Sequence, residues 1–358
     1  MTSSSLTLLL VGDPHYKNDN FKTTDLLEQG VFNYLAEWQP DVVVIMGDIF
    51  NDFDKSRIPQ AVRVNRFLKA LAAKVPTICL IGNHDRASPE TFLTEEHFLI
   101  GIKGWPNLDI VDQGLVKTIV KGKESYHLAC LPYVPPGRFD EALGQLGLLP
   151  MEESLSRLRF VSEQLNSQNL KLHQMHLVLA HQEVKGAQVK PGIQSSQGDI
   201  WPADRPPLAS GHLHERQHLP PNIWFVGTPY QVNRDESPDK GIAKVTLTGY
   251  QLPVISYHEL PIAPHVTVYL TVAEAYNYQA PTGKVLEVVI RGLEAEIKAF
   301  EKSPAGKALK KVAKLTPDVI KVENDKVIKM IERPNYWQVV SNKLNDRQRE
   351  LLTRILQQ

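Results

Sequence analysis

The chain has 358 residues, 42% of them hydrophobic and 22% charged, a composition typical of soluble globular proteins. No apolar run approaches the ~20 residues that a membrane-spanning helix needs, and the Met-Thr-Ser-Ser-Ser start lacks the basic and apolar segments of an export signal. We therefore expect a cytoplasmic protein with no membrane partner. Its two cysteines, Cys79 and Cys130, lie within apolar runs, which indicates buried reduced thiols and excludes a disulfide framework.

Charge is balanced over the whole chain but not along it. Lys and Arg together number 40, as do Asp and Glu. Residues 281–358 hold 16 basic against 10 acidic residues, a net charge of +6, which leaves −6 for residues 1–280. A basic C-terminal part can be an interaction tail or a solvated helix surface rich in lysine, and both interpretations stay open.

The first 85 residues alternate between strand and helix patterns. Aliphatic runs predict strands at 6–11, 41–46 and 77–81, and apolar residues at helical spacing predict helices at 24–38 and 59–73. Strands joined by crossover helices in this way predict a parallel sheet.

The middle of the chain is richer in strand patterns. Strands are expected at 110–111, 116–120, 127–131, 175–180, 207–210 and 223–226, and a hairpin at 242–258 that turns at Thr248-Gly249. A helix is expected at about 152–166. The polar segment 185–198 is expected to lack regular structure, either as a substrate-contacting loop or as an ordinary connection.

A domain boundary is expected at 260–264, where two of five residues are proline. Strands at 266–272, 285–290 and 319–322 and a helix at about 293–315 then predict a small α+β domain. Apolar residues on one face predict a final helix at about 337–356.

Five short motifs with metal-ligating side chains each follow a strand run. They are Asp13-Pro14-His15, Gly47-Asp48, Gly82-Asn83-His84-Asp85, His181 and Gly211-His212-Leu213-His214. Because buried strands end at each motif, we expect these side chains to meet at one place. Each motif alone is weak, since a lone Asp-x-His or Gly-Asp occurs by chance in many proteins. All five in this order predict a binuclear metal site.

The residue types suit such a site. Two divalent ions about 3.5–4 Å apart can clamp a phosphate and ionise a water for in-line attack. Asp48 is the best candidate for a bridging carboxylate, and Asn83 offers an amide oxygen. The other candidate ligands are Asp13, His15, His181, His212 and His214, a mixed set that suits manganese, iron or zinc. His84 is the candidate general acid, with Asp85 to orient it.

The order and wording of these motifs resemble the calcineurin-like metallophosphoesterase superfamily, over residues 6 to about 259. The resemblance implies an α/β fold, a four-layer αββα sandwich of two mixed sheets flanked by helices. It also implies two bound divalent ions, with Mn²⁺ preferred and Mg²⁺, Fe²⁺ or Zn²⁺ as alternatives. One ion would be held by Asp13, His15, Asp48 and His214, and the other by Asp48, Asn83, His181 and His212, with His84 as the acid that meets the leaving group.

The residues around the ligands resemble one branch, the SbcD-type DNA nuclease, the bacterial and phage counterpart of the meiotic-recombination-eleven nuclease. Gly227-Thr228-Pro229-Tyr230-Gln231 is the most telling segment, because it lies outside the ligands. The resemblance implies a nuclease domain at 1–260, a DNA-contacting capping domain at 266–334 and a C-terminal helix at 335–358 that docks an ATPase. The implied partners are DNA, an SbcC-type coiled-coil ATPase and a second copy of the chain, in the cytoplasm or nucleoid of a bacterial cell.

Two features depart from that branch. Asn51 stands where archaeal and eukaryotic members carry a second histidine after the bridging aspartate, which puts a second catalytic histidine in doubt. The chain also ends soon after the capping region, so a docking segment would be compact, and its apolar face could instead pack on its own domain.

Five basic residues are candidate contacts to a DNA backbone. Arg86, Arg216 and Arg234 are close in sequence to a ligand or to the Gly-Thr-Pro segment, and Lys185 and Lys190 lie in the polar loop. The alternative for the arginines is an ion pair within the protein.

Three functions stay open. The leading one is a metal-dependent DNA exonuclease and endonuclease, acting in an SbcCD-type end-processing, repair and recombination complex. The second is a phosphodiesterase or phosphatase on nucleotides or phosphoproteins, because the same ligands serve all of these reactions. The third is a DNA-end-binding scaffold in which catalysis is dispensable.

Overall fold

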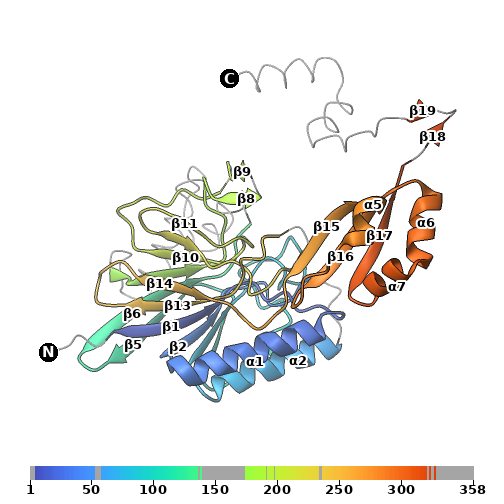
Figure 1. Cartoon of the computed structure of the whole chain (residues 1–358). Coiled ribbons are helices and arrows are strands. Elements are labelled where there is room, and N and C mark those ends of the chain that lie inside the picture. The colour runs from blue at the N-terminus through green and yellow to red at the C-terminus, as the bar shows by residue number, and fades with distance from the viewer. Residues whose placement is uncertain are drawn as a thin grey trace, which may run out of the picture. The chain divides into compact units, whose positions relative to one another are not determined.

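The computed structural model describes residues 5–52, 58–135, 138, 174–190, 192–196, 198–233, 236–320, 322–323 and 326–327. The chain divides into two compact units, Met1–His265 and Val266–Gln358, and each is described by itself (Figure 1). No helix among the described residues is both long and apolar enough to cross a bilayer. Cys79 and Cys130 are free and buried, as expected.

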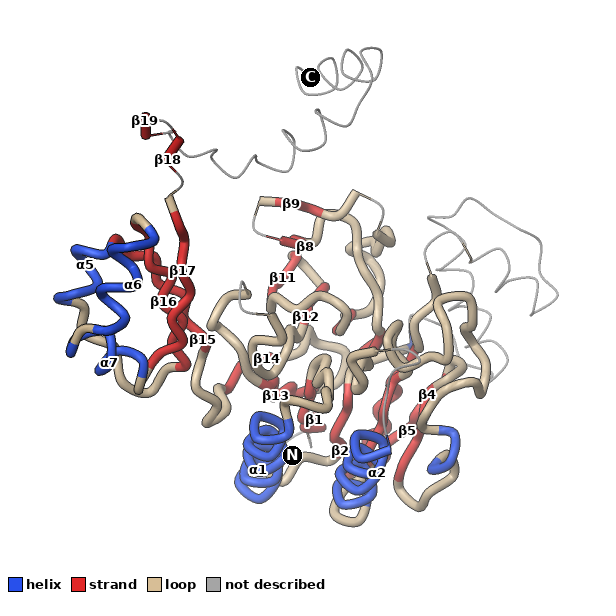
Figure 2. Tube along the Cα trace, turned by 90° about the vertical axis from the view of Figure 1, so that its right-hand side faces the viewer, coloured by secondary structure: helices blue, strands red, loops and turns tan. Residues whose placement is uncertain are grey.

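The first sheet of the larger unit contains the strands predicted at the start of the chain. Its strands are β1 (Leu6–Val11), β2 (Val42–Ile45), β3 (Thr77–Leu80), β4 (Leu108–Val111), β13 (Ile242–Leu247) and β14 (Val254–His258), in the order β14-β13-β1-β2-β3-β4. β1 to β4 are parallel, and β13 and β14 form the expected hairpin. Helices α1 (Phe21–Trp38) and α2 (Ile58–Ala72) lie side by side along one face (Figures 1 and 2). A short 3₁₀ helix, η1 (Ile100–Ile102), precedes β4.

The second sheet is also mixed. Its strands are β5 (Leu115–Lys121), β6 (Glu124–Leu131), β7 (Leu177–Ala180), β10 (Leu208–Ser210), β11 (Gln217–Leu219) and β12 (Ile223–Phe225), in the order β11-β12-β10-β7-β6-β5. β6, β7, β10 and β12 are parallel. The carboxyl ends of β7 and β10 lead directly into the histidine motifs.

Side chains that alternate along β1 fill two different layers of the core. Leu9 and Val11 pack in the cluster with the residues of α1 and α2, whereas Leu8 and Leu10 pack in the cluster that the two sheets share. All four are fully buried, as expected for a strand covered on both faces. The mixed two-sheet sandwich is therefore confirmed. The helix expected at 152–166 lies outside the described residues.

The expectation that 185–198 lacks regular structure was wrong. This segment contains a two-stranded hairpin, β8 (Gln188–Lys190) and β9 (Ile193–Gln194). Gly192 allows the turn, with φ of 77°. The side chain of Gln217 accepts a hydrogen bond from the Gln188 N–H at 2.7 Å and donates one to the Gln188 carbonyl at 2.9 Å. These tertiary hydrogen bonds explain why a polar segment forms strands.

The smaller unit is α+β, but its elements differ from the predicted ones. They are β15 (His265–Thr271), α5 (Val272–Asn277), β16 (Val285–Gly292), α6 (Glu294–Lys302), α7 (Pro304–Lys310) and β17 (Ala313–Val319), with the sheet order β15-β16-β17. The single helix expected at 293–315 is two helices and the start of a strand. The Ser303 hydroxyl accepts the Gly306 N–H, and Pro304 follows as the first helical residue, so a new helix begins there. A two-residue pair, β18 (Val322–Glu323) and β19 (Lys326–Val327), follows.

Candidate metal centre

The first predicted ligand pair stands on a turn directly after β1. Asp13 is fully buried and His15 almost so. His15 has a left-handed backbone, with φ of 44°, a conformation that costs of order 1–3 kcal/mol in residues other than glycine. Its N–H donates to the carbonyl of Asp48 at 3.0 Å. The turn after β1 is thus held against the turn after β2.

That second turn places Asp48 between the other ligand candidates. Asp48 also has a left-handed backbone, with φ of 46°, and follows Gly47. Its Oδ2 lies 3.9 Å from Nε2 of His15 and 3.3 Å from Nε2 of His181. Its Oδ1 accepts the backbone N–H of His84 at 2.8 Å. Asp48 thus lies between His15 and His181, which belong to different predicted ligand sets. A carboxylate that bridges two ions needs this position.

Asn83 meets two histidines from the second sheet. Its Oδ1 lies 3.0 Å from Nε2 of His181 and 2.8 Å from Nδ1 of His212. Two donors that each lie about 2.1 Å from one ion would be separated by about 3 Å at near-right angles. These three atoms therefore have the spacing of ligands around a single ion.

The ligand candidates fall into two trios, Asp13-His15-His214 and Asp48-His181-His212. Within each trio, one donor atom per residue lies within 4.8 Å of the others. In the first, Nε2 of His15 lies 3.1 Å from Nε2 of His214. The same division follows from the sequence resemblance, which adds Asp48 to the first trio and Asn83 to the second. Ligation itself stays a prediction.

The surroundings of Asp13 show whether these residues fit a divalent ion. Both of its carboxylate oxygens are buried and accept no hydrogen bond from the described residues. Burial raises the pKa of Asp13 to about 6. A buried carboxylate without a partner costs several kcal/mol, whereas a divalent ion beside it would supply the missing positive charge. The residues of both trios therefore fit two divalent ions.

In two of the histidines, one ring nitrogen hydrogen-bonds an oxygen of the protein and the second ring nitrogen faces the other ligand candidates. Nδ1 of His181 lies 2.7 Å from the carbonyl oxygen of Met46, and Nδ1 of His214 lies 2.7 Å from Oε1 of Glu236. A carbonyl and an ionised carboxylate can only accept, so Nδ1 carries the proton in both rings. Loss of the remaining ring proton would leave the lone pair on Nε2, which faces the other ligand candidates.

Electrostatics keep Asp48 and Glu236 ionised. Burial alone would raise the pKa of Asp48, but the charges of His181 and His15 and a hydrogen bond from His181 hold it far below its usual range. Burial would likewise raise the pKa of Glu236, and the hydrogen bond from His214 with the charges of His214 and Lys240 lowers it to about 2.

Two glycines let the ligand turns pack against each other. A Cβ at Gly82 would lie 2.2 Å from Oδ1 of Asp48 and 2.3 Å from its backbone nitrogen. A Cβ at Gly47 would lie 2.3 Å from Nδ1 of His181, and the φ of Gly47 is 102°. Any larger residue at either position would displace a ligand candidate, which explains the glycine of each motif.

His84 and Asp85 have different surroundings. The His84 ring is half-buried, and its centroid lies 5.3 Å from that of His15. Asp85 is fully buried, and its two oxygens accept the N–H groups of Phe50 at 2.9 Å and Gly82 at 2.8 Å. Burial raises the pKa of Asp85 to about 7. Asp85 thus joins two ligand turns, and its predicted effect on His84 stays a prediction.

Arg86 lies inside the protein. It is 5% exposed, and its guanidinium donates to the carbonyls of Asn83 and Pro89, both at 3.3 Å, and of Thr91 at 2.6 Å. Its Cζ lies 5.0 Å from the ring centre of Tyr133. A DNA contact by Arg86 would have to compete with these interactions.

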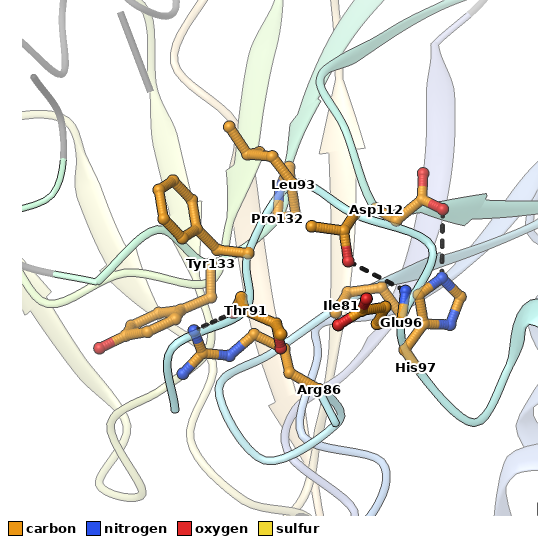
Figure 3. A pocket seen from close by; sticks show the side chains of 11 residues that line it. Ile81, Arg86, Thr91, Leu93, Glu96, His97, Asp112, Pro132 and Tyr133 are labelled. Atoms are coloured by element: carbon orange, nitrogen blue, oxygen red, sulfur yellow. Dashed lines mark hydrogen bonds and ion pairs between the residues drawn. The ribbon is translucent and has the colours of Figure 1, made fainter. Parts of the chain in front are cut away.

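Arg86 and Tyr133 also line a pocket with His97 and Asp112 (Figure 3). Its enclosed volume is about 10 Å³, room for about one water molecule, far below the roughly 300–1,000 Å³ of sites that enclose small ligands. The Tyr133 ring stacks on His212 with 5.4 Å between centroids, so the pocket adjoins the cluster through one ring. Its size does not suit a nucleotide.

The other predicted DNA contacts differ in their surroundings. Lys185 and Lys190 are exposed, the latter on β8. Arg216 pairs with Asp239 through both ends of its guanidinium. Arg234 lies outside the described residues. All of them remain predictions.

Sequence reasoning missed Glu236, Lys240 and the role of Tyr230. Glu236 and Lys240 lie in the loop before β13, and neither belongs to a motif. The only available signal was chemical, because metal-ligating histidines need an acceptor for their second nitrogen. The Tyr230 hydroxyl donates to the carbonyl of Pro14, so the Gly-Thr-Pro segment supports the first ligand turn.

The sequence is similar to that of known proteins. The sequence profile of the family described as Calcineurin-like phosphoesterase matches residues 6–216, which span all seven predicted ligands. The protein named Putative phosphoesterase 078R, of Invertebrate iridescent virus 3, is 28% identical over 312 residues, 86% of this chain and 82% of that protein. Putative phosphoesterase 244L, of Invertebrate iridescent virus 6, is 27% identical over 301 residues, 83% of this chain and 97% of that protein. Neither name states a substrate.

Proposed function

We propose that this chain, which belongs to the calcineurin-like phosphoesterase family and is therefore a phosphoester hydrolase, acts on DNA. In this proposal it is a metal-dependent exonuclease and endonuclease, the nuclease subunit of an SbcCD-type complex for end processing, repair and recombination. The Gly227 to Gln231 segment carries the proposal, because it resembles SbcD-type nucleases and its Tyr230 bonds the turn of Asp13 and His15.

The described residues can perform the parts of phosphodiester hydrolysis that fall to the protein. Two divalent ions at this centre, with Mn²⁺ the preferred candidate, would supply Lewis acidity for a phosphate and an attacking water. Asp48 and the histidines would hold the ions in place. His84 stands at the edge of the cluster, fixed by its N–H to Asp48, where its ring can give a proton to the leaving oxygen.

The role of His84 can be tested in the full-length chain. With Mn²⁺, the wild-type protein should shorten linear duplex DNA, and His84→Ala should cut it at least about 100-fold more slowly, the usual share of a general acid. The variant should still bind two ions by elemental analysis. His218→Ala is the matched control, because His218 is exposed and stacks on Trp224, and it should cut DNA normally. Wild-type rates in His84→Ala would refute the assignment.

The substrate can be tested separately from the chemistry. At equal Mn²⁺, a DNA nuclease should hydrolyse DNA much faster than bis(p-nitrophenyl) phosphate, mononucleotides or phosphopeptides. The reverse order would support the second candidate, a phosphodiesterase or phosphatase, which fits the family membership and the names of both viral relatives equally well. Full biological activity of Asp48→Ala would instead favour a non-catalytic scaffold.

Two partners belong to this proposal. A second copy of the chain could pack on the outer surface of α1 and α2, where Ile58 is 81%, Val62 59% and Leu26 37% exposed. Analytical ultracentrifugation should then show a dimer that Ile58→Asp with Val62→Asp converts to monomers. An SbcC-type ATPase would dock on 335–358, outside the described residues, and co-purification with and without this segment tests it.

A further inference from the structure

We propose that Glu236 and Lys240 form a clamp that positions His214 as a ligand of one metal ion and not of the other. This inference rests on the two-ion site proposed above. Neither residue is among the predicted ligands, and both come from one loop, between β12 and β13.

The clamp holds His214 at its ring and at its backbone. Oε1 of Glu236 accepts the Nδ1–H of His214 at 2.7 Å, and Nζ of Lys240 donates to the His214 carbonyl at 2.8 Å. The two clamp residues also pair with each other, with Lys240 Nζ 3.2 Å from Glu236 Oε2. The ring of His214 can therefore neither rotate nor change tautomer without breaking a charged hydrogen bond.

Glu236 is itself fixed by the backbone. Its Oε2 accepts the N–H of Val232 at 3.0 Å, and its Oε1 accepts the N–H of Asn233 at 3.1 Å. Lys240 is 6% exposed and reaches Oε1 of Glu215 at 3.3 Å. A nearly buried lysine needs such partners, because an unpaired buried charge costs several kcal/mol. The clamp is thus built before any ion is bound.

Among the described residues, none forms an equivalent clamp on His212. Oε2 of Glu183 lies 3.9 Å from its Nε2, too far for a hydrogen bond. The His181 ring in that trio is held by the Met46 carbonyl. Loss of Glu236 should therefore selectively weaken binding of the ion at Asp13, His15 and His214.

Calorimetric titration of the metal-free, full-length protein with Mn²⁺ tests this. Wild type should bind two ions, and Glu236→Ala should weaken one binding step by about 10- to 100-fold, the usual effect of removing such a hydrogen-bond partner, while the other step is unchanged. Glu236→Gln keeps the shape and one acceptor, so it should fall between the two. Lys240→Met should weaken the same step.

Asp239→Asn is the matched control, since Asp239 lies in the same loop but is itself half-exposed and pairs with Arg216. It should leave both binding steps unchanged. Substrate turnover adds a second readout: because Glu236 acts through an ion, a large excess of Mn²⁺ should restore most of kcat in Glu236→Ala.

The outcomes separate this inference from the proposed function. If wild type fails to bind two ions, the two-ion site itself is wrong. If wild type binds two and both steps are unchanged, or equally weakened, in the Glu236 variants, the clamp is wrong. Should Glu236→Ala fail to fold, the isosteric Glu236→Gln and Lys240→Met carry the test. If both variants bind Mn²⁺ as wild type does, the clamp is wrong.

Discussion

The hydroxyl of Tyr230 donates to the backbone carbonyl of Pro14, so two segments 216 residues apart meet beside the predicted metal ligands. The amide of Asn20 donates to the same hydroxyl at 2.9 Å and to the carbonyl of His15 at 3.0 Å. His15 has left-handed backbone geometry that surrounding structure must maintain. Tyr230 and Asn20 are the side chains that maintain it.

Tyr230→Phe should therefore weaken the metal centre without unfolding the protein. Loss of the hydroxyl removes its bonds with Pro14 and Asn20, each worth about 0.5–1.5 kcal/mol of stability, and freedom of the His15 turn should lower Mn²⁺ affinity several-fold. Tyr34→Phe removes a hydrogen bond from a tyrosine on α1 to the Glu259 carbonyl at 2.8 Å, which involves none of the ligand turns. Thermal unfolding should show lower stability for both variants, and only Tyr230→Phe should lower metal affinity. Equal affinities would contradict this role.

Gly82→Ala should disrupt the centre by steric conflict. The added methyl group would meet both the side chain and the backbone of Asp48, and the backbone cannot move aside as a flexible side chain could. Overpacking of this kind costs about 1–3 kcal/mol, and because Asp48 is the predicted bridge, we expect its displacement to abolish tight binding of two ions. Gly101→Ala is the control, because no atom lies within 4 Å of a Cβ there. Retention of two tightly bound ions by Gly82→Ala would refute the expected displacement.

The sequence was sufficient for the parts of the site that lie on buried strands. β1, β2 and β3 read as aliphatic runs, and Leu8 to Val11 are buried on both faces, so the strand ends could be placed. A parallel sheet then brings those ends to one edge. Asp13, Asp48 and Asn83 meet in the structure for this reason.

The missed features depend on contacts that no local pattern encodes. Glu236 is one acidic residue in a polar loop, and only the fold brings it to His214. The β8 and β9 hairpin needs Gln217, about thirty residues away, to pair its backbone. In the smaller unit, residues 293–315 have a helical pattern throughout, and Pro304 is compatible with it as the first residue of a new helix, so the pattern does not show that one helix ends and another begins there.

Asp13→Asn should have opposite effects on stability with and without metal. In the metal-free protein, burial raises the pKa of Asp13 to about 6, above the ~3.9 of an unfolded chain. Ionisation at pH 7.5 therefore opposes folding, and a neutral amide should raise stability by of order 1 kcal/mol. With Mn²⁺ the order should reverse, because the carboxylate is then paired with the ion. Thermal unfolding of wild type and Asp13→Asn, in chelator and in Mn²⁺, measures both effects. If the same protein is the more stable one in both conditions, Asp13 is not a ligand.

Asp112→Asn should reveal a separate, pH-dependent contribution on the pocket side of the first sheet. Asp112 is 4% exposed, and its Oδ2 lies 3.1 Å from Nε2 of His97 and 2.7 Å from Nζ of Lys103. Burial would raise the pKa of Asp112, but these two hydrogen bonds outweigh it and lower the pKa. A lowered folded-state pKa stabilises the protein above the unfolded value of about 3.9, and this stabilisation is lost as the pH falls further.

The variant should consequently be less stable than wild type by about 1–3 kcal/mol at pH 7, with the difference shrinking below pH ~4 as Asp112 itself becomes protonated. Urea unfolding of the metal-free proteins at pH 7, 5 and 3.5 measures this difference without contribution from bound ions. Asp109→Asn is the control, because its pair with Lys117 is about one-third exposed and should contribute at most about 1 kcal/mol. A difference between Asp112→Asn and wild type that stays constant over this range would show that the carboxylate charge is not what stabilises the site.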